Sequence, residues 1–216
     1  SDFQQVNINM GDGDTKHVQI NRGKVETTNI TTGSKGDLVQ IQGDSLMEGR
    51  NSIYTGAGKD DVEIRGSKLN GTATAKTFIN TGADKDHARI TFQSSALNTG
   101  DGNDTVKVTN TTFLKLADGN PSAIDTGNGD DTITIKDGTI FQDFSYIAAG
   151  NGVDTITLES GAKFNQANVY ADAGDDIINV NGAEFKGENA YNHNAGVHGG
   201  AGDDKIFVNS GKFDNA

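Results

Sequence analysis

The sequence predicts an all-β fold, a right-handed parallel β-helix (β-solenoid) of about nine coils, each with about 24 residues and three short strands. Three observations predict this fold. A loop rich in glycine and aspartate recurs along the chain, an alternating apolar segment follows each loop, and single apolar residues recur at similar distances beyond it. Because one such coil cannot bury its own apolar face, neighbouring coils must stack into a continuous core.

The recurring loop is clearest in "TGNGDDTITI", which begins at Thr126, and in "AGNGVDTITL", which begins at Ala149. Related segments begin at positions 32, 55, 81, 99, 171 and 199, and a degenerate copy begins at position 11. The sixth position of the loop is aspartate in all but the degenerate copy: Asp37, Asp60, Asp86, Asp104, Asp131, Asp154, Asp176 and Asp204. This regular return indicates one loop per coil.

The first strand of each coil follows the loop directly. Apolar residues stand two and four positions after the aspartate, as in Ile133 and Ile135, and this period of two indicates a strand with one buried face. A second strand is marked by Val25, Leu46, Leu69, Phe113, Ile140 with Phe141, Phe164, Phe185 and Phe213. A third is marked by Ile8, Ile30, Ile53, Ile79, Leu97, Ile124, Ile147, Val169 and Val197. We expect residues 1–216 to form a single solenoid domain cut from a longer protein, and we find no amphipathic helical stretch of the kind that a globular α/β domain needs.

Composition narrows the classes of partner. The chain has 216 residues, only 33% of them apolar, and 29 glycines against one proline, which suits tight turns around a thin core. Its formal charge of −12 disfavours nucleic acid and anionic membranes as partners and favours cations. The absence of cysteine excludes disulfides and Cys-ligated zinc. No run of eighteen apolar residues occurs, so we expect no membrane insertion.

If the coils stack in register, their loops form one column along an edge of the rod. More than half of the 30 acidic residues then lie in that column. Like charges about 5 Å apart cost on the order of 1–3 kcal/mol per pair near a protein surface, so a counter-charge is needed. Calcium is the apt cation, because it takes six to eight oxygen ligands, which aspartates and the carbonyls of glycine-rich turns can supply.

The loops resemble the RTX, or haemolysin-type calcium-binding, nonapeptide G-G-x-G-x-D-x-U-x, in which U is a large aliphatic residue. "GGAGDDKIF" (199–207) matches every fixed position, and three other loops miss only the first glycine. The resemblance implies calcium between consecutive loops, export from a Gram-negative bacterium, and ligand roles for Asp104, Asp131, Asp154, Asp176 and Asp204. The other expected ligands in these loops are Asp101, Asp130, Asp175, Asp203, Gly100, Gly102, Gly127, Gly129, Gly150, Gly152, Gly174, Gly200 and Gly202.

Two departures from the family pattern bear on the metal. The coils are longer than the family's and carry one loop each, so we expect one calcium column and a three-sided cross-section. Lys35, Lys59 and Lys85 enter three consecutive early loops, where an ammonium can offset the carboxylates, so we expect calcium from residue 99 onward and weak or absent sites before it. The alternative is that the loop aspartates only cap backbone N–H groups as Asx turns.

Other candidate positions have simple structural explanations. Thr32, Thr55, Thr81, Thr99 and Thr126 precede the loop glycine in five coils and predict a ladder of hydroxyl groups. His193 and His198 lie in the long insertion 186–198, and two histidines without a third ligand favour a solvent-facing loop over a transition-metal site. Tyr54, Tyr146 and Tyr170 are expected to point outward, where aromatic rings can stack on sugars.

We interpret the chain as a non-catalytic, calcium-stabilised structural or adhesive segment of a secreted or cell-surface bacterial protein. Its expected partners are calcium and a cell-surface glycan or protein. The alternatives are a lyase-like polysaccharide-active enzyme, because β-helices host such enzymes, and a glycan-binding module. Against an enzyme, all four arginines precede residue 90, and neither a Gly-x-Ser-x-Gly nor a His-Glu-x-x-His motif is present.

Overall fold

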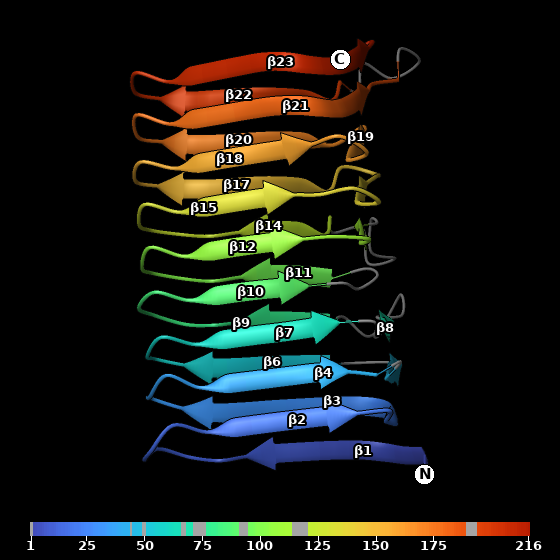
Figure 1. The fold of residues 1–216 in the computed structure, drawn as a ribbon, viewed down its shortest axis with the longest axis vertical. Coiled ribbons are helices and arrows are strands. Elements are labelled where there is room, and N and C mark those ends of the chain that lie inside the picture. Colours follow the sequence, from blue (N-terminus) through green and yellow to red (C-terminus); the bar gives the residue numbers. More distant parts are fainter. Residues whose placement is uncertain are drawn as a thin grey trace.

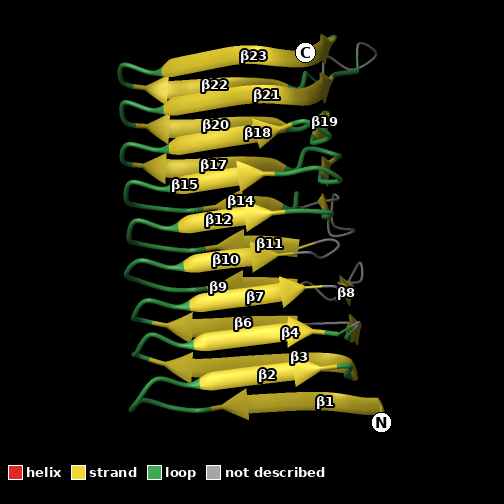
Figure 2. Cartoon of the chain, viewed as in Figure 1, coloured by secondary structure: helices red, strands yellow, loops and turns green. Residues whose placement is uncertain are grey.

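The computed structural model describes residues 2–43, 45–48, 51–65, 68–70, 77–90, 95–113, 121–188 and 194–216. Figure 1 shows these residues as stacked coils that rise from the N-terminus to the C-terminus. Every regular element among them is a β-strand, as the colours of Figure 2 show, and every strand pairing is parallel. The all-β parallel solenoid that the repeats predict is confirmed. Among the described residues, no helix has the length and apolar character needed to cross a membrane.

The strands fall on three sides of the solenoid. The first side follows each loop and comprises β2 (His17–Asn21), β4 (Leu38–Gln42), β7 (Asp61–Arg65), β10 (His87–Ile90), β12 (Thr105–Val108), β15 (Thr132–Ile135), β18 (Thr155–Glu159), β21 (Ile177–Lys186) and β23 (Lys205–Asp214). The return side leads into the next loop and comprises β1 (Asp2–Asn9), β3 (Lys24–Gly33), β6 (Asn51–Gly56), β9 (Thr77–Asn80), β11 (Ser95–Asn98), β14 (Ala123–Asp125), β17 (Tyr146–Asn151), β20 (Asn168–Ala173) and β22 (Gly196–Ala201). The short side between them comprises β5 (Leu46–Glu48), β8 (Lys68–Asn70), β13 (Thr112–Phe113), β16 (Ile140–Phe141) and β19 (Lys163–Asn165), with the ends of β21 and β23 and the start of β3.

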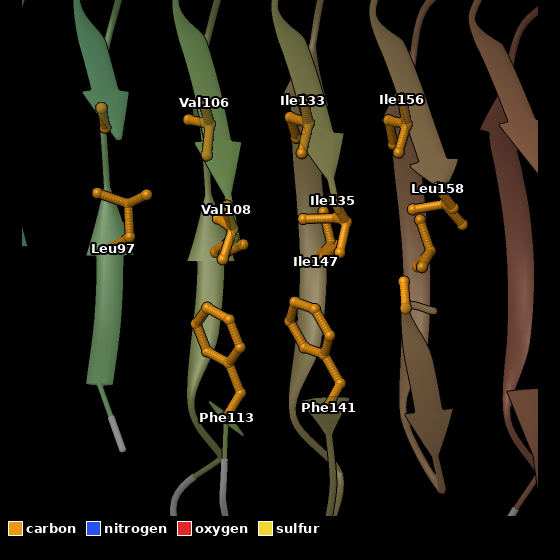
Figure 3. Packing of buried hydrophobic residues seen from close by; sticks show 14 of the residues in the cluster. Leu97, Val106, Val108, Phe113, Ile133, Ile135, Phe141, Ile147, Ile156 and Leu158 are labelled. Carbon is orange, nitrogen blue, oxygen red and sulfur yellow. The ribbon is translucent and has the colours of Figure 1, made fainter. Parts of the chain in front are cut away.

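The core consists of ladders in which each coil places the same kind of residue above its neighbour. Val106 pairs with Ile133, and Ile133 pairs with Ile156. These side chains are fully buried, and Figure 3 shows them with Val108, Ile135 and Leu158 pointing into the solenoid. The alternating pattern of the sequence therefore places one face of the first-side strands in the core, because successive side chains of a strand point to opposite faces. The exception is β23 at the end of the stack, whose residues are exposed.

A stack of phenylalanines fills the corner beside the short side. The rings of Phe113, Phe141, Phe164, Phe185 and Phe213 are nearly parallel, with successive centroids 4.3, 4.8, 4.7 and 4.9 Å apart. The spacing equals the distance between paired strands, so the coil repeat itself sets the stacking distance. The predicted second-strand residues thus form one continuous apolar ladder in this half of the rod.

Two details of the prediction need correction. In the part of the chain that the structure describes, the complete turns number about six rather than about nine. The coils of β1 and β23 lie at the two ends, and the third side of the β10 coil falls outside the described residues. The second correction concerns register, since Met47 rather than Leu46 pairs with Val25 and with Leu69.

Candidate functional site

The loops between the return side and the first side stack along one edge, seen at the left of Figure 1. Their backbones approach so closely that a Cβ atom would not fit at most of the glycines in the second and fourth loop positions. A Cβ atom on Gly150 would lie 1.9 Å from the carbonyl oxygen of Gly127, and a Cβ on Gly152 would lie 2.0 Å from that of Gly129. At such glycines the stack excludes a side chain and also requires a positive φ. Asp84, at a fourth position, and Asp172, at a second position, also have a positive φ, so a few loops accommodate a side chain there.

All nine expected glycine ligands have this left-handed backbone conformation: Gly100, Gly102, Gly127, Gly129, Gly150, Gly152, Gly174, Gly200 and Gly202. Carbonyls at the second position already accept a hydrogen bond from the next coil, as in Asn151 N to Gly127 O at 2.8 Å. The glycines therefore shape the loop and join neighbouring loops.

The sixth-position aspartates form a column inside the loop edge, which we call the inward column: Asp37, Asp60, Asp86, Asp104, Asp131, Asp154, Asp176 and Asp204. Each Oδ1 accepts a hydrogen bond from the backbone N–H of the equivalent residue in the preceding coil. The N–H of Asp131 donates to Asp154 Oδ1 at 2.8 Å, and that of Asp154 donates to Asp176 Oδ1 at 2.8 Å. The sixth-position aspartates therefore cap N–H groups of a neighbouring coil rather than form the expected local Asx turns, and these bonds hold the loops in register.

The second oxygen of these carboxylates has no such partner. Among the described residues, no hydrogen-bond donor reaches Oδ2 of Asp131, Asp154 or Asp176, and these residues are at most 1% exposed. Asp37, Asp60 and Asp86 share this arrangement. A buried carboxylate oxygen without a donor or cation is unfavourable, so the inward column demands a counter-charge.

The pKa values of the inward column also show that the charged form of these carboxylates is unfavourable. Burial raises the pKa of Asp86 and Asp154 to about 7 and that of Asp60 and Asp131 to about 6, from an ordinary value of 3.8. Hydrogen bonds from the backbone oppose this shift, and neighbouring carboxylates increase it. Burial also raises the pKa of Asp176. A proton or a metal cation can relieve each of these carboxylates.

The third- and fifth-position aspartates lie on the outer surface of the loops. Asp101, Asp130, Asp175 and Asp203 are exposed, whereas the sixth-position residues beside them point inward. Asp130 Oδ1 accepts the N–H of Val153 at 2.9 Å, and Asp175 Oδ1 accepts that of Asp203 at 2.9 Å. The structure therefore does not bring the two expected sets of aspartates together, because adjacent residues project to opposite sides of the backbone.

The loop lysines also lie outside. Lys35, Lys59 and Lys85 are exposed, so their ammonium groups face solvent while the early carboxylates of the inward column are buried. Their presence gives no reason for the early coils to differ from the later ones in the inward column. In the first loop, Lys16 takes the sixth position itself, and its backbone N–H donates to Asp37 Oδ1 at 2.6 Å.

Calcium fits the inward column better than the outer one. In the described residues, no group of three or more His, Cys, Asp or Glu side chains converges on one point. The inward column instead offers one hard carboxylate oxygen without a hydrogen-bond donor in most of the described coils. Such oxygens suit calcium. Successive members among Asp104, Asp131, Asp154, Asp176 and Asp204 would hold the ion, which would supply positive charge between stacked carboxylates.

The other sequence candidates occupy structural positions. The hydroxyl ladder is present: Thr126 Oγ1 donates to Ala149 O at 2.8 Å, and the preceding four threonines donate to the next threonine carbonyl. His198 stacks on Tyr170, with ring centroids 4.8 Å apart, and Tyr146 meets the edge of Tyr170. This outward ladder of rings was not predicted. His193 lies outside the described residues.

Comparison with known protein families supports the resemblance of the loops to calcium-binding repeats. The family model for four copies of the RTX calcium-binding nonapeptide repeat matches residues 47–63 and 197–212. The first match includes the loop with Lys59, so the similarity is not confined to the C-terminal half. No curated protein and no solved structure matches the chain. The parallel coils and the matched repeats together make this chain an RTX-like β-solenoid.

Proposed function

We propose that the chain is a calcium-stabilised structural segment of a secreted or surface-exposed bacterial protein, where it acts as a non-catalytic rod that presents its outer loops to a glycan or protein. RTX calcium-binding repeats and a β-solenoid fit a calcium-binding structural segment. The observation that carries the proposal is the inward column, whose buried Oδ2 atoms need a cation.

Calcium acts here through linkage between binding and folding. The ion binds the stacked loops of the folded chain, whereas an unfolded chain presents no such arrangement. A site occupied at a free calcium concentration a hundred times its Kd stabilises the fold by about 2.7 kcal/mol. Several occupied sites in one column would therefore raise the free energy of unfolding of the chain by several times this amount. Low cytosolic calcium would keep the chain loose during export, and extracellular calcium would then rigidify it.

Titration calorimetry on the metal-free chain tests the binding itself. We expect calcium to bind at several sites per chain, and magnesium in the same buffer to bind far more weakly, because it demands a tighter octahedral geometry than stacked loops provide. The absence of calcium heat, or equal binding of both ions, would contradict the proposal.

The alternative functions find less support in the described residues. A sugar stacks on an exposed ring face, but His198 stacks on one face of the Tyr170 ring, and Tyr146 packs against Tyr170 in a T-shaped contact. A hollow of about 290 Å³ is lined by Asn165, Gln166, Lys186, Gly187 and Glu188. The Glu188 carboxylate that lines this hollow accepts a hydrogen bond from Gln166 Nε2 at 2.6 Å. A glycan array and an assay for unsaturated lyase products distinguish these alternatives, and a positive result in the lyase assay would refute the non-catalytic role.

A further inference from the structure

The first position of each loop divides the inward column into two parts. Threonine stands there in the loops of Asp37, Asp60, Asp86, Asp104 and Asp131, as Thr32, Thr55, Thr81, Thr99 and Thr126. The loops of Asp154, Asp176 and Asp204 have Ala149, Ala171 and Gly199 instead. The lysines do not mark this boundary, since they lie on the outer surface of the first three of these loops.

Each threonine adds a buried bond between coils. Their hydroxyl groups donate to the carbonyl of the first-position residue in the next coil, at 3.1, 3.0, 3.1, 3.2 and 2.8 Å along the series. All five residues are fully buried. The last such bond ends at the carbonyl of Ala149, and neither Ala149 nor Ala171 has a hydroxyl to continue the ladder.

The threonines also lie against the column. Each threonine stands five residues before the aspartate of its own loop, and both residues are buried. The hydroxyl hydrogen is donated to the carbonyl of the next coil, so the threonine joins neighbouring coils beside the carboxylates. Where alanine or glycine stands in place of threonine, no hydroxyl is available to donate this bond between coils. In the last loop, a Cβ on Gly199 would lie 2.3 Å from Asp204 Oδ2.

We infer that the first loop position determines how strongly each coil depends on calcium: the threonine coils have a buried bond between coils that requires no metal, whereas the coils of Asp154, Asp176 and Asp204 have no such donor and depend on the ion. Unpartnered Oδ2 atoms occur in both parts of the column, so the hydroxyl bonds between coils, and not the carboxylates, distinguish the two parts. This inference rests on the proposed calcium function and adds a boundary within the rod, between Thr126 and Ala149. The N-terminal part would serve as a pre-formed template on which calcium orders the C-terminal coils.

Hydrogen–deuterium exchange of the full chain, in EDTA and in calcium, tests the boundary. We expect calcium to slow exchange about tenfold or more in β18 and β20–β23, and less than about twofold in β4–β12. Equal slowing along the whole rod would overturn the inference and leave the calcium function standing. No slowing anywhere would instead refute the calcium function.

Exchanging the first-position residues tests the cause. Ala149→Thr with Ala171→Thr should raise the melting temperature in EDTA and reduce by about half its rise on calcium addition. Ala148→Thr, in the same strand but on its outward side, is the matched control and should change neither. An unchanged calcium response in the double variant would overturn the inference.

Replacing threonine by alanine gives a second test, which remains available if the alanine-to-threonine variant does not fold. Thr99→Ala with Thr126→Ala should lower the melting temperature in EDTA and make the exchange rates of β12 and β15 respond to calcium. Thr134→Ala, on the outward side of β15, is its control. Failure of β12 and β15 to gain a calcium response would contradict a role for the hydroxyl.

Discussion

At the scale of single residues, the two oxygens of each sixth-position aspartate have different roles. Oδ1 accepts a backbone N–H from the preceding coil, and Oδ2 remains without a donor among the described residues of most coils. The carboxylate thus joins the coils through one atom and creates a demand for positive charge through the other. Glycine at the second and fourth positions permits the close approach that places these carboxylates above one another.

Asp154→Asn separates the two roles. The amide oxygen still accepts the N–H of Asp131, while the negative charge is lost. We expect the metal-free chain to gain about 1–2 kcal/mol, because a buried charge disappears, and the calcium-induced stabilisation to fall. Chemical unfolding with and without calcium measures both.

Asp130→Asn is the matched control, since it removes the same charge at the neighbouring exposed position. It should leave the calcium response nearly unchanged. If the two variants lose calcium stabilisation equally, the inward column is not the site that binds the ion.

Stability of the metal-free chain should fall as pH rises. Burial raises the pKa of Asp86 and Asp154 to about 7 and of Asp60 and Asp131 to about 6, so the folded chain binds protons more tightly than the unfolded chain does. The stabilisation is complete below about pH 4 and is lost through pH 6–7. Between pH 5 and pH 8 we expect a loss on the order of 2–5 kcal/mol, reduced by proton sharing between neighbours.

Urea unfolding in EDTA across this range provides the measurement. A midpoint that rises with pH would mean that the aspartates are stabilised as anions without metal. In saturating calcium the dependence should weaken or reverse, because the ion replaces the proton.

At the scale of elements, the ladders require the same residue class in every coil. The first-side strands β4, β7, β12, β15, β18 and β21 each contribute two buried aliphatic residues, and in the later coils the short side contributes one ring per coil to the phenylalanine stack. Since each strand pairs only with its neighbours in adjacent coils, a defect in one coil acts mainly on the coils above and below it.

Gly150→Ala tests the close approach of the loops. Its Cβ would meet the carbonyl of Gly127 at 1.9 Å, so we expect a loss of about 2–4 kcal/mol from forced separation of two coils and from strain at positive φ. Gly11→Ala is the control, because Gly11 also has a positive φ but has no atom within 4 Å of the added Cβ. Equal destabilisation in thermal unfolding would show that φ alone requires glycine.

Phe164→Ala tests the ring stack. The Phe164 ring is fully buried between Phe141 and Phe185, and we expect its loss to cost about 3–5 kcal/mol. Phe213, at the end of the stack, is 45% exposed, so Phe213→Ala should cost less than half as much. Similar costs in chemical unfolding would argue against the stack as a core element.

At the scale of the whole molecule, periodicity in the sequence was sufficient to predict the solenoid. The spacing of Ile133 and Ile135 after Asp131 predicted the first side, and the residues equivalent to Ile147 predicted the return side. A period-two pattern reports directly which residues face the core. The register of the short side was harder, because Leu46 and Met47 are both apolar and composition does not decide between them.

The candidate site was only partly predictable. The loop motif predicted the column of aspartates but treated positions five and six as one ligand set, although alternation along the backbone sends Asp130 outward and Asp131 inward. The same alternation places Lys59 and Lys85 outside. The contact between His198 and Tyr170 follows from the register of the return side, where Val197 pairs with Val169 and the next residues pair in turn, so the sequence pattern already contained this signal.

The central claim is that calcium neutralises the inward column and thereby stabilises the rod. A thermal melt followed by circular dichroism, in EDTA and then across a calcium titration with magnesium as control, tests it most directly. We predict a rise in melting temperature of about 10 °C or more that is specific to calcium, since about 1 kcal/mol shifts the melting temperature of a chain of this size by about 2–4 °C. A melting temperature that does not change with calcium, or that rises equally with magnesium, would contradict the claim.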